Sequence, residues 1–177
     1  MKTRTIADMN VGVIGLGAMA LVEYDPKPSD KEAIDLLQYA VKIGVKLIDT
    51  ADVYGLGRNE KQIGALTAQE KNEILIATKV GCTRPGGGWG TDGRPIHIKE
   101  GIKGSLEKLG LNSIELYQLH TPDHRVPFKN SIKALKELKE SGLVKHIGLS
   151  NVNLQQLQEA QKIVKIVSVQ NRYNMSH

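Results

Sequence analysis

Hydrophobic and polar positions divide this chain into segments of two kinds, short continuous apolar runs and longer stretches with helical spacing. The apolar runs predict six buried strands, at residues 11–16, 45–49, 74–79, 114–119, 146–150 and 167–170. Between them, apolar residues that recur every three or four positions predict helices near residues 30–43, 59–66, 98–109, 132–141 and 154–164. Ser29 and Glu32 have the spacing of a capping box at the start of the first helix.

Strands and helices therefore alternate along the whole chain. Most of the strands are apolar without polar alternation, and such strands are covered on both faces, as in a parallel sheet with helical crossovers. Two folds share this pattern, the doubly wound sheet and the (β/α)8 barrel. Periodicity alone does not choose between them.

The first strand ends in G-L-G-A-M-A, in which Gly15, Gly17 and Ala20 have the spacing of a dinucleotide-binding fingerprint. That fingerprint needs a helix that begins inside the motif. Pro26 and Pro28 follow too closely for a regular helix to run through this region. The interpretation we favour is a buried strand whose glycines allow a close approach to the backbone.

Composition narrows the class of protein. The 177 residues carry 24 Lys and Arg against 19 Asp and Glu, a net charge of +5 that is spread along the chain. With one Trp, one Phe and five Tyr there is no aromatic platform beside a basic stripe, so we expect no nucleic acid partner. The N-terminal apolar run is broken by glycines and preceded by Asp8, which argues against a secretory signal. A single cysteine, Cys82, and the lack of a long apolar run favour a cytoplasmic protein with no membrane span.

Polar residues stand where five consecutive predicted strands end. They are Asp49, with Tyr54 five residues beyond it, then Lys79, His120, the pair Ser150 and Asn151, and finally Gln170. Each could be an ordinary capping, solvated or structural residue. Because the carboxyl ends of parallel strands meet at one mouth, we expect these side chains to converge there.

The chain resembles the aldo-keto reductases in a series of ordered motifs: GLGAM, DTADVYG followed by GRNEKQIG, ATK, SLEKLGLNSIELYQLH, GLVKHIGLSN and VSVQNRYN. The resemblance implies a (β/α)8 barrel that reduces small carbonyl substrates with a nicotinamide cofactor, usually NADPH. It also implies that Gly17, Ala18 and Met19, at the glycine-containing strand end, approach the cofactor without a Rossmann helix.

The resemblance implies a role for each strand-end residue. Tyr54 would donate the proton, since negative charge builds on the carbonyl oxygen during hydride transfer. Lys79 would stabilise the phenolate, Asp49 would hold Lys79 and contact the cofactor, and His120 would orient the carbonyl. The nicotinamide carboxamide would be held by Ser150, Asn151 and Gln170. We expect no metal ligand, and we interpret Tyr117, a competing acid, as a packing residue.

A complete barrel of this kind needs about 250 residues. We therefore expect a single domain over residues 1–177 that is truncated after strand six, with about six βα units present and the last two missing. The first and sixth strands would then be open edges, which favours a homo-oligomer formed through them. Two functions follow as alternatives: a reductase of aldehydes or ketones, and a catalytically weak or silent chain that acts through self-association or partner binding.

Overall fold

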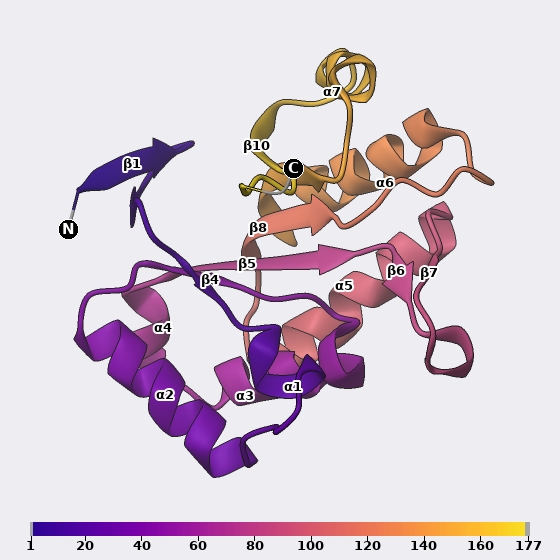
Figure 1. The fold of residues 1–177 in the computed structure, drawn as a ribbon. Coiled ribbons are helices and arrows are strands. Elements are labelled where there is room, and N and C mark those ends of the chain that lie inside the picture. The colour runs from indigo at the N-terminus through magenta and orange to yellow at the C-terminus, as the bar shows by residue number, and fades with distance from the viewer. Residues whose placement is uncertain (1, 176–177) are drawn as a thin grey trace.

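The computed structural model describes residues 2–175, and its centre is a six-stranded parallel sheet (Figure 1). The strands lie in the order β10-β9-β8-β5-β4-β3. Their bounds are Leu16–Gly17 (β3), Leu47–Asp49 (β4), Leu75–Val80 (β5), Ile114–Leu119 (β8), Val144–Ser150 (β9) and Ile166–Gln170 (β10).

The strand order decides between the two folds that periodicity left open. Each strand of the sheet pairs in parallel with the next one along the chain. A doubly wound sheet reverses its order at a switch point, whereas a barrel keeps its strands consecutive. The predicted incomplete (β/α)8 barrel is therefore confirmed, with β3 and β10 as its two edges.

Helices follow the strands as predicted. The longer ones are α2 (Asp30–Lys42), α3 (Arg58–Gly64), α5 (Pro95–Leu109), α6 (Phe128–Glu140) and α7 (Leu154–Gln161). Ser29 and Glu32 form the predicted capping box, in which the Ser29 amide donates to the Glu32 carboxylate at 2.8 Å. Two shorter helices were not predicted, α1 (Ala20–Glu23) and α4 (Ala68–Asn72), although Thr67 at the N-cap of α4 and Glu70 within it have the same capping spacing.

The main core lies between the sheet and these helices. Its fully buried members come from both layers, with Ile48, Ile147 and Leu149 on strands and Ile102 and Leu135 on helices. Neighbouring helices contact each other along the outside of the sheet, α3 with α5, α5 with α6 and α6 with α7.

The opposite face of the sheet is partly covered by an N-terminal hairpin, β1 (Thr3–Ile6) and β2 (Met9–Gly12). Val11 of this hairpin packs against Leu75, Ala77 and Leu116. The hairpin thus closes the amino-terminal ends of the strands and leaves their carboxyl ends open.

The prediction of one strand at residues 11–16 is wrong. Val11 and Gly12 end β2, and the strand of the main sheet is β3, which starts only at Leu16. The hairpin turn uses Ala7 in a left-handed conformation (φ 54°) and lacks the glycine that usually signals such a turn. Gly15 packs closely on β4, since a Cβ there would lie 2.9 Å from Leu47 Cδ2 and that side chain would have to move.

The glycine-rich segment after β5 forms a small hairpin of its own, β6 (Cys82–Thr83) with β7 (Gly90–Thr91), around a short 3-10 turn, η2 (Pro85–Gly87). The Arg84 guanidinium lies 3.3 Å from the ring centroid of Trp89 and pairs with Glu23 of α1. This segment is therefore an ordered loop and not a linker.

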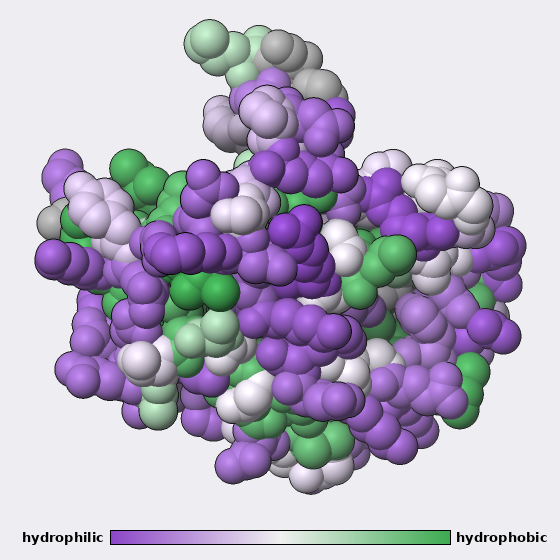
Figure 2. Space-filling view, turned by 90° about the horizontal axis from the view of Figure 1, so that it is seen from below, coloured by the Kyte–Doolittle hydropathy of each residue, from purple (hydrophilic) through white to green (hydrophobic). Residues whose placement is uncertain are grey.

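The surface is mixed on the face shown in Figure 2, where green apolar patches are interrupted by purple polar side chains. Apolar residues are exposed beside the two sheet edges: Ile14 is 64% exposed near β3, and Val169 is 44% exposed on β10. Among the described residues, no helix is long and apolar enough to cross a membrane.

Candidate active site

The strand-end residues come together because side chains alternate along a strand. In β5, Leu75 and Ala77 face the N-terminal hairpin, so Lys79, two residues further on, projects from the same face. Asp49 stands opposite Ala77 in the neighbouring strand. His120 follows β8, and its amide donates to the Val80 carbonyl at 2.8 Å.

Lys79 and Asp49 form an ion pair inside this arrangement. The Lys79 Nζ lies 2.6 Å from Asp49 Oδ1 and also donates to the Thr50 carbonyl oxygen at 2.8 Å. The Lys79 side chain is almost completely buried, at 2% exposure. An ammonium held by a carboxylate and a carbonyl is a fixed positive charge rather than a mobile surface group.

Tyr54 and His120 form the second contact of the site. Tyr54 begins the short turn η1 (Tyr54–Gly57), which follows β4, and its phenol oxygen lies 3.4 Å from His120 Nε2. The two rings meet edge to face, with centroids 5.5 Å apart. The Lys79 Nζ is 5.2 Å from the Tyr54 ring centroid, within reach of a cation–π interaction.

Burial sets the charge states of these groups. Burial lowers the pKa of His120 to about 3, and the nearby Lys79 ammonium acts in the same direction. Burial also raises the pKa of Tyr54 well above its ordinary value, with the Asp49 carboxylate adding to the effect. Burial lowers the pKa of Lys79, and the Asp49 carboxylate opposes this shift. At neutral pH the site therefore holds a neutral imidazole and a protonated phenol.

Of the amide and hydroxyl groups predicted at the next two strand ends, Asn151 contacts both His120 and Ser150, whereas the Gln170 side chain contacts Gln118. Asn151 has a left-handed backbone (φ 55°), and its Nδ2 donates to the His120 carbonyl and to Ser150 Oγ, both at 3.0 Å. The Asn151 amide donates to the Gln170 carbonyl at 3.2 Å. The Gln170 side chain accepts from Gln118 Nε2 at 3.5 Å.

The glycine-containing strand end borders the same region. Gly17 pairs with Asp49, and the Ala18 amide donates to the Asp49 carbonyl at 2.8 Å. A Cβ on Gly17 would meet nothing within 4 Å, so this strand end faces open space. Met19 contributes to the wall of the cleft described next.

A cleft of about 1080 Å³ opens at the carboxyl ends of the strands. Its lining includes the predicted residues Met19, His120 and Asn151, and Tyr54 is buried against His120. Further side chains that line it are Glu23, Tyr24, Cys82, Arg84, Trp89, Thr121, His124, Arg125 and Arg172.

Sequence reasoning offered Trp89 as a wall of the substrate pocket but did not find Arg84 beside it. The stacking of Arg84 on Trp89 has no signature, because it depends on how the loop hairpin folds. Tyr117, in contrast, is fully buried on the outer face of β8, where a Cβ added to Gly101 of α5 would lie 3.4 Å from its hydroxyl. It is therefore separated from the cleft by the sheet.

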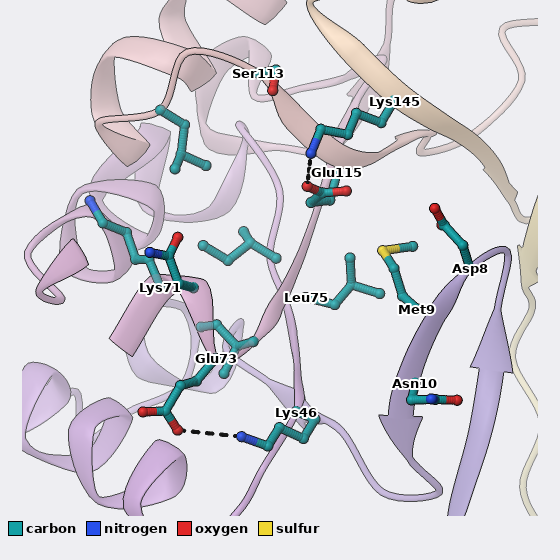
Figure 3. Close-up of a pocket in the computed structure, with 14 residues that line it drawn as sticks. Asp8, Met9, Asn10, Lys46, Lys71, Glu73, Leu75, Ser113, Glu115 and Lys145 are labelled. Carbon is teal, nitrogen blue, oxygen red and sulfur yellow. Dashed lines mark hydrogen bonds and ion pairs between the residues drawn. The ribbon is translucent and has the colours of Figure 1, made fainter. Parts of the chain in front are cut away.

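A second pocket, of about 450 Å³, lies at the opposite ends of the strands (Figure 3). Its charged groups are paired with one another: Lys46 with Glu73 at 3.4 Å, and Lys145 with Glu115. Lys71 donates to two backbone carbonyls. Barrel enzymes carry their catalytic residues at the carboxyl ends of the strands, so we do not assign the active site to this pocket.

Within residues 2–175, no group of three or more His, Cys, Asp and Glu side chains is arranged to hold an ion.

Comparison with known proteins places this geometry in context. The profile of the Aldo/keto reductase family matches residues 13–177. An uncharacterized oxidoreductase of Schizosaccharomyces pombe is 35% identical over 98% of this chain and 58% of its own length. Pyridoxine 4-dehydrogenase of Escherichia coli is 35% identical over 99% of this chain and 65% of its own length. The chain thus spans less than two thirds of both relatives.

Solved structures agree with the sequence comparison. An aldo-keto reductase of Bacillus halodurans, solved in its holo form, superposes with a TM-score of 0.85 and 34% identity over 98% of this chain and 58% of its own. The glycerol dehydrogenase of Gluconobacter oxydans gives a TM-score of 0.90 and 28% identity over 99% of this chain and 56% of its own. Together with the profile match over residues 13–177, these likenesses show that the chain belongs to the aldo/keto reductase family.

Proposed function

We propose that this protein reduces aldehydes or ketones to alcohols with a nicotinamide cofactor. The observation that carries the proposal is the cluster of Asp49, Tyr54, Lys79 and His120 at one end of a half-barrel, in a chain of the aldo/keto reductase family. A cation, a phenol and a neutral imidazole in contact are the groups that a carbonyl oxygen needs when it gains negative charge.

Tyr54 is the proposed proton donor. Its raised pKa keeps the phenol protonated at neutral pH, so it has a proton to give. A buried phenolate would be costly unless a positive charge stood nearby, and the Lys79 ammonium supplies that charge. Asp49 holds Lys79 in place through the 2.6 Å ion pair.

His120 is proposed to orient the carbonyl oxygen. The pKa of about 3 keeps its ring neutral, so one ring nitrogen carries a hydrogen to donate without a competing positive charge. Its Nε2 is the nitrogen that lies beside the Tyr54 phenol. A carbonyl oxygen placed between these two groups would receive two hydrogen bonds.

The residues at the cleft fit the nicotinamide end of a cofactor. Open space beside Gly17 leaves room for a planar ring. Asn151 in the cleft wall, with Ser150 hydrogen-bonded to it and Gln170 at the next strand end, offers the donors and acceptors that a carboxamide requires. When bound, the reduced cofactor supplies the hydride. NADPH is our preferred form, by resemblance to the family, and Ala18 and Met19 would border it.

The test is to follow the hydride itself. The chain would be incubated with 4-nitrobenzaldehyde and NADPH that carries deuterium at its transferable position, and the alcohol would be analysed by mass spectrometry. We expect one deuterium in the alcohol, and no turnover with a Lys79→Met variant. An alcohol without deuterium, or none at saturating aldehyde and cofactor, would overturn the proposal.

A second candidate is self-association, favoured by the two unpaired edges of the sheet. Ile14 beside β3 and Val169 on β10 expose apolar surface next to backbone groups that could pair with another copy. In this form the chain would be weakly active or silent, and its behaviour would be dominated by contacts between copies or with another partner.

A further inference from the structure

Asn59 is a completely buried polar residue that the proposed chemistry does not use. It is the second residue of α3, close to the N-cap position at which asparagine is favoured. The structure excludes that ordinary role, because Gly57 is the N-cap and no side chain caps this helix. The Asn59 amide group is turned inward instead.

The Asn59 side chain makes three hydrogen bonds. Its Oδ1 accepts from the Thr50 hydroxyl at 2.6 Å. Its Nδ2 donates to the Ala18 carbonyl at 3.0 Å and to Gln62 Oε1 at 3.1 Å. A buried amide with this many partners is held in one orientation.

Two of these partners belong to the proposed site. Thr50 follows the strand β4, and its backbone carbonyl is the second acceptor of the Lys79 ammonium, at 2.8 Å. Ala18 follows β3, and its amide donates to the Asp49 carbonyl. Asn59 therefore bridges two neighbouring strand ends, one beside the glycine-containing edge of the cleft and one that holds Lys79.

The third partner connects Asn59 to the outside of the protein. Gln62 Nε2 donates to Asp30 Oδ1 at 2.8 Å, and Arg58 Nε donates to the same carboxylate oxygen at 2.7 Å. Asp30 is the first residue of α2, so this contact joins α2 to α3. It lies on the side of Asn59 that is away from the cleft.

We propose that Asn59 is a positioning residue, which sets the distance between the Lys79 ammonium and the backbone at Gly17 to Met19 by hydrogen-bonding both Thr50 and Ala18. Its catalytic consequence rests on the proposed function, but its effect on Lys79 does not. The Asn59 side chain touches neither the ion pair nor the cleft, and it acts only through its two neighbours.

The experiment compares Asn59→Leu with Gln62→Met as a matched control. Both remove buried hydrogen bonds, but the control leaves the bonds to Thr50 and Ala18 in place. We expect Asn59→Leu to weaken NADPH binding and to lower kcat by about tenfold each, and to move the NMR signal of the Lys79 ε-carbon. The control should lower the urea midpoint to a similar extent without moving that signal.

A second pair of variants covers the case in which Asn59→Leu does not fold. Thr50→Val removes the hydroxyl that donates to Asn59 while keeping the shape, and Thr50→Ser restores it. We expect Thr50→Val to move the Lys79 signal and Thr50→Ser to return it. Signals that stay at the wild-type position in Thr50→Val and in folded Asn59→Leu would overturn the proposal.

The NMR comparison also separates the two proposals. If the wild-type chain neither binds NADPH nor reduces an aldehyde, the proposed function fails. The Lys79 signal in the variants still decides whether Asn59 positions that side chain.

Discussion

At the scale of single residues, burial rather than proximity to charge dominates the proposed site. The Tyr54 phenol and the His120 imidazole are both kept neutral by the cost of placing charge in a dry environment. Burial lowers the pKa of Lys79 as well, but the Asp49 carboxylate opposes this shift, and the Thr50 carbonyl accepts a further hydrogen bond from the ammonium. The site therefore presents one fixed ion pair beside two neutral groups that can donate hydrogen bonds.

Removal of the Tyr54 hydroxyl tests the proposed proton donor. We expect Tyr54→Phe to lower kcat by about 100-fold or more with little change in KM, because the proton is needed only in the transition state. Steady-state kinetics with NADPH and a saturating aldehyde would measure both constants. Tyr117→Phe is the matched control, since that phenol is buried on the opposite side of the sheet and should not affect kcat. An unchanged kcat in Tyr54→Phe would show that another group donates the proton.

Asp52 makes a separate prediction about pH. Burial, reinforced by the neighbouring Glu60 carboxylate and opposed by Lys108 and Lys79, raises the pKa of Asp52 to about 8. The folded chain then binds a proton that the unfolded chain has released, so stability falls as the pH rises from about 4 to about 8.

The Asp52 effect can be isolated between pH 6.5 and 8 by comparison with Asp52→Asn, because the histidines titrate alike in both proteins. We expect the free energy of unfolding of the wild type to fall by up to about 2 kcal/mol more than that of Asp52→Asn over this window. Urea titrations at the two pH values would measure it. Equal slopes in the two proteins would show that Asp52 is ionised in the folded state.

The strand-end residues could be predicted from the sequence because they follow apolar runs directly. Asp49, Lys79 and His120 needed only the rule that parallel strands share one carboxyl end. Asn59 could not be found in this way, because its partners Ala18 and Thr50 become neighbours of each other only when β3 and β4 pair. Their pairing register is a property of the fold and leaves no mark on the sequence around Asn59.

At the scale of elements, the close packing of α3 against α5 depends on one glycine. Gly64, the last residue of α3, lies against α5, and a Cβ there would be 2.0 Å from the Lys108 carbonyl oxygen. A contact between backbones cannot be relieved by turning a side chain. The two helices would have to separate, and the core between them would open.

We expect Gly64→Ala to lower the free energy of unfolding by about 3 kcal/mol. Urea denaturation would measure the loss. Gly88→Ala is the control: it has no left-handed backbone, and its Cβ would meet only the Pro85 carbonyl, at 3.5 Å. A stability loss equal to that of the control would show that α3 and α5 are not packed as closely as described.

The elements themselves were predicted where their pattern was long and continuous. The helices α2, α5 and α6 and the strands β5 and β8 have unbroken periodicity, and they were predicted within a few residues. The N-terminal hairpin was missed because its strands have only four residues each and its turn lacks glycine. Such short strands are stabilised by packing on the sheet, here through Val11, more than by their own sequence.

At the scale of the whole molecule, the open edges predict concentration-dependent association. Unpaired strand edges beside apolar side chains favour pairing between copies. We expect the sedimentation coefficient to rise with protein concentration, and Val169→Lys on β10 to reduce the rise, because a charged edge resists pairing. A single monomeric species over the whole concentration range would contradict this prediction.

The consecutive strand order has a consequence for how the chain reaches its structure. Each parallel pairing joins a strand to its successor, so each new βα unit needs only the unit before it as a template. Contacts of short sequence separation form faster than distant ones, because less chain entropy is lost when the intervening segment closes. The sheet can therefore grow from β3 toward β10 in the order in which a ribosome delivers the strands, and assembly need not wait for the last residue.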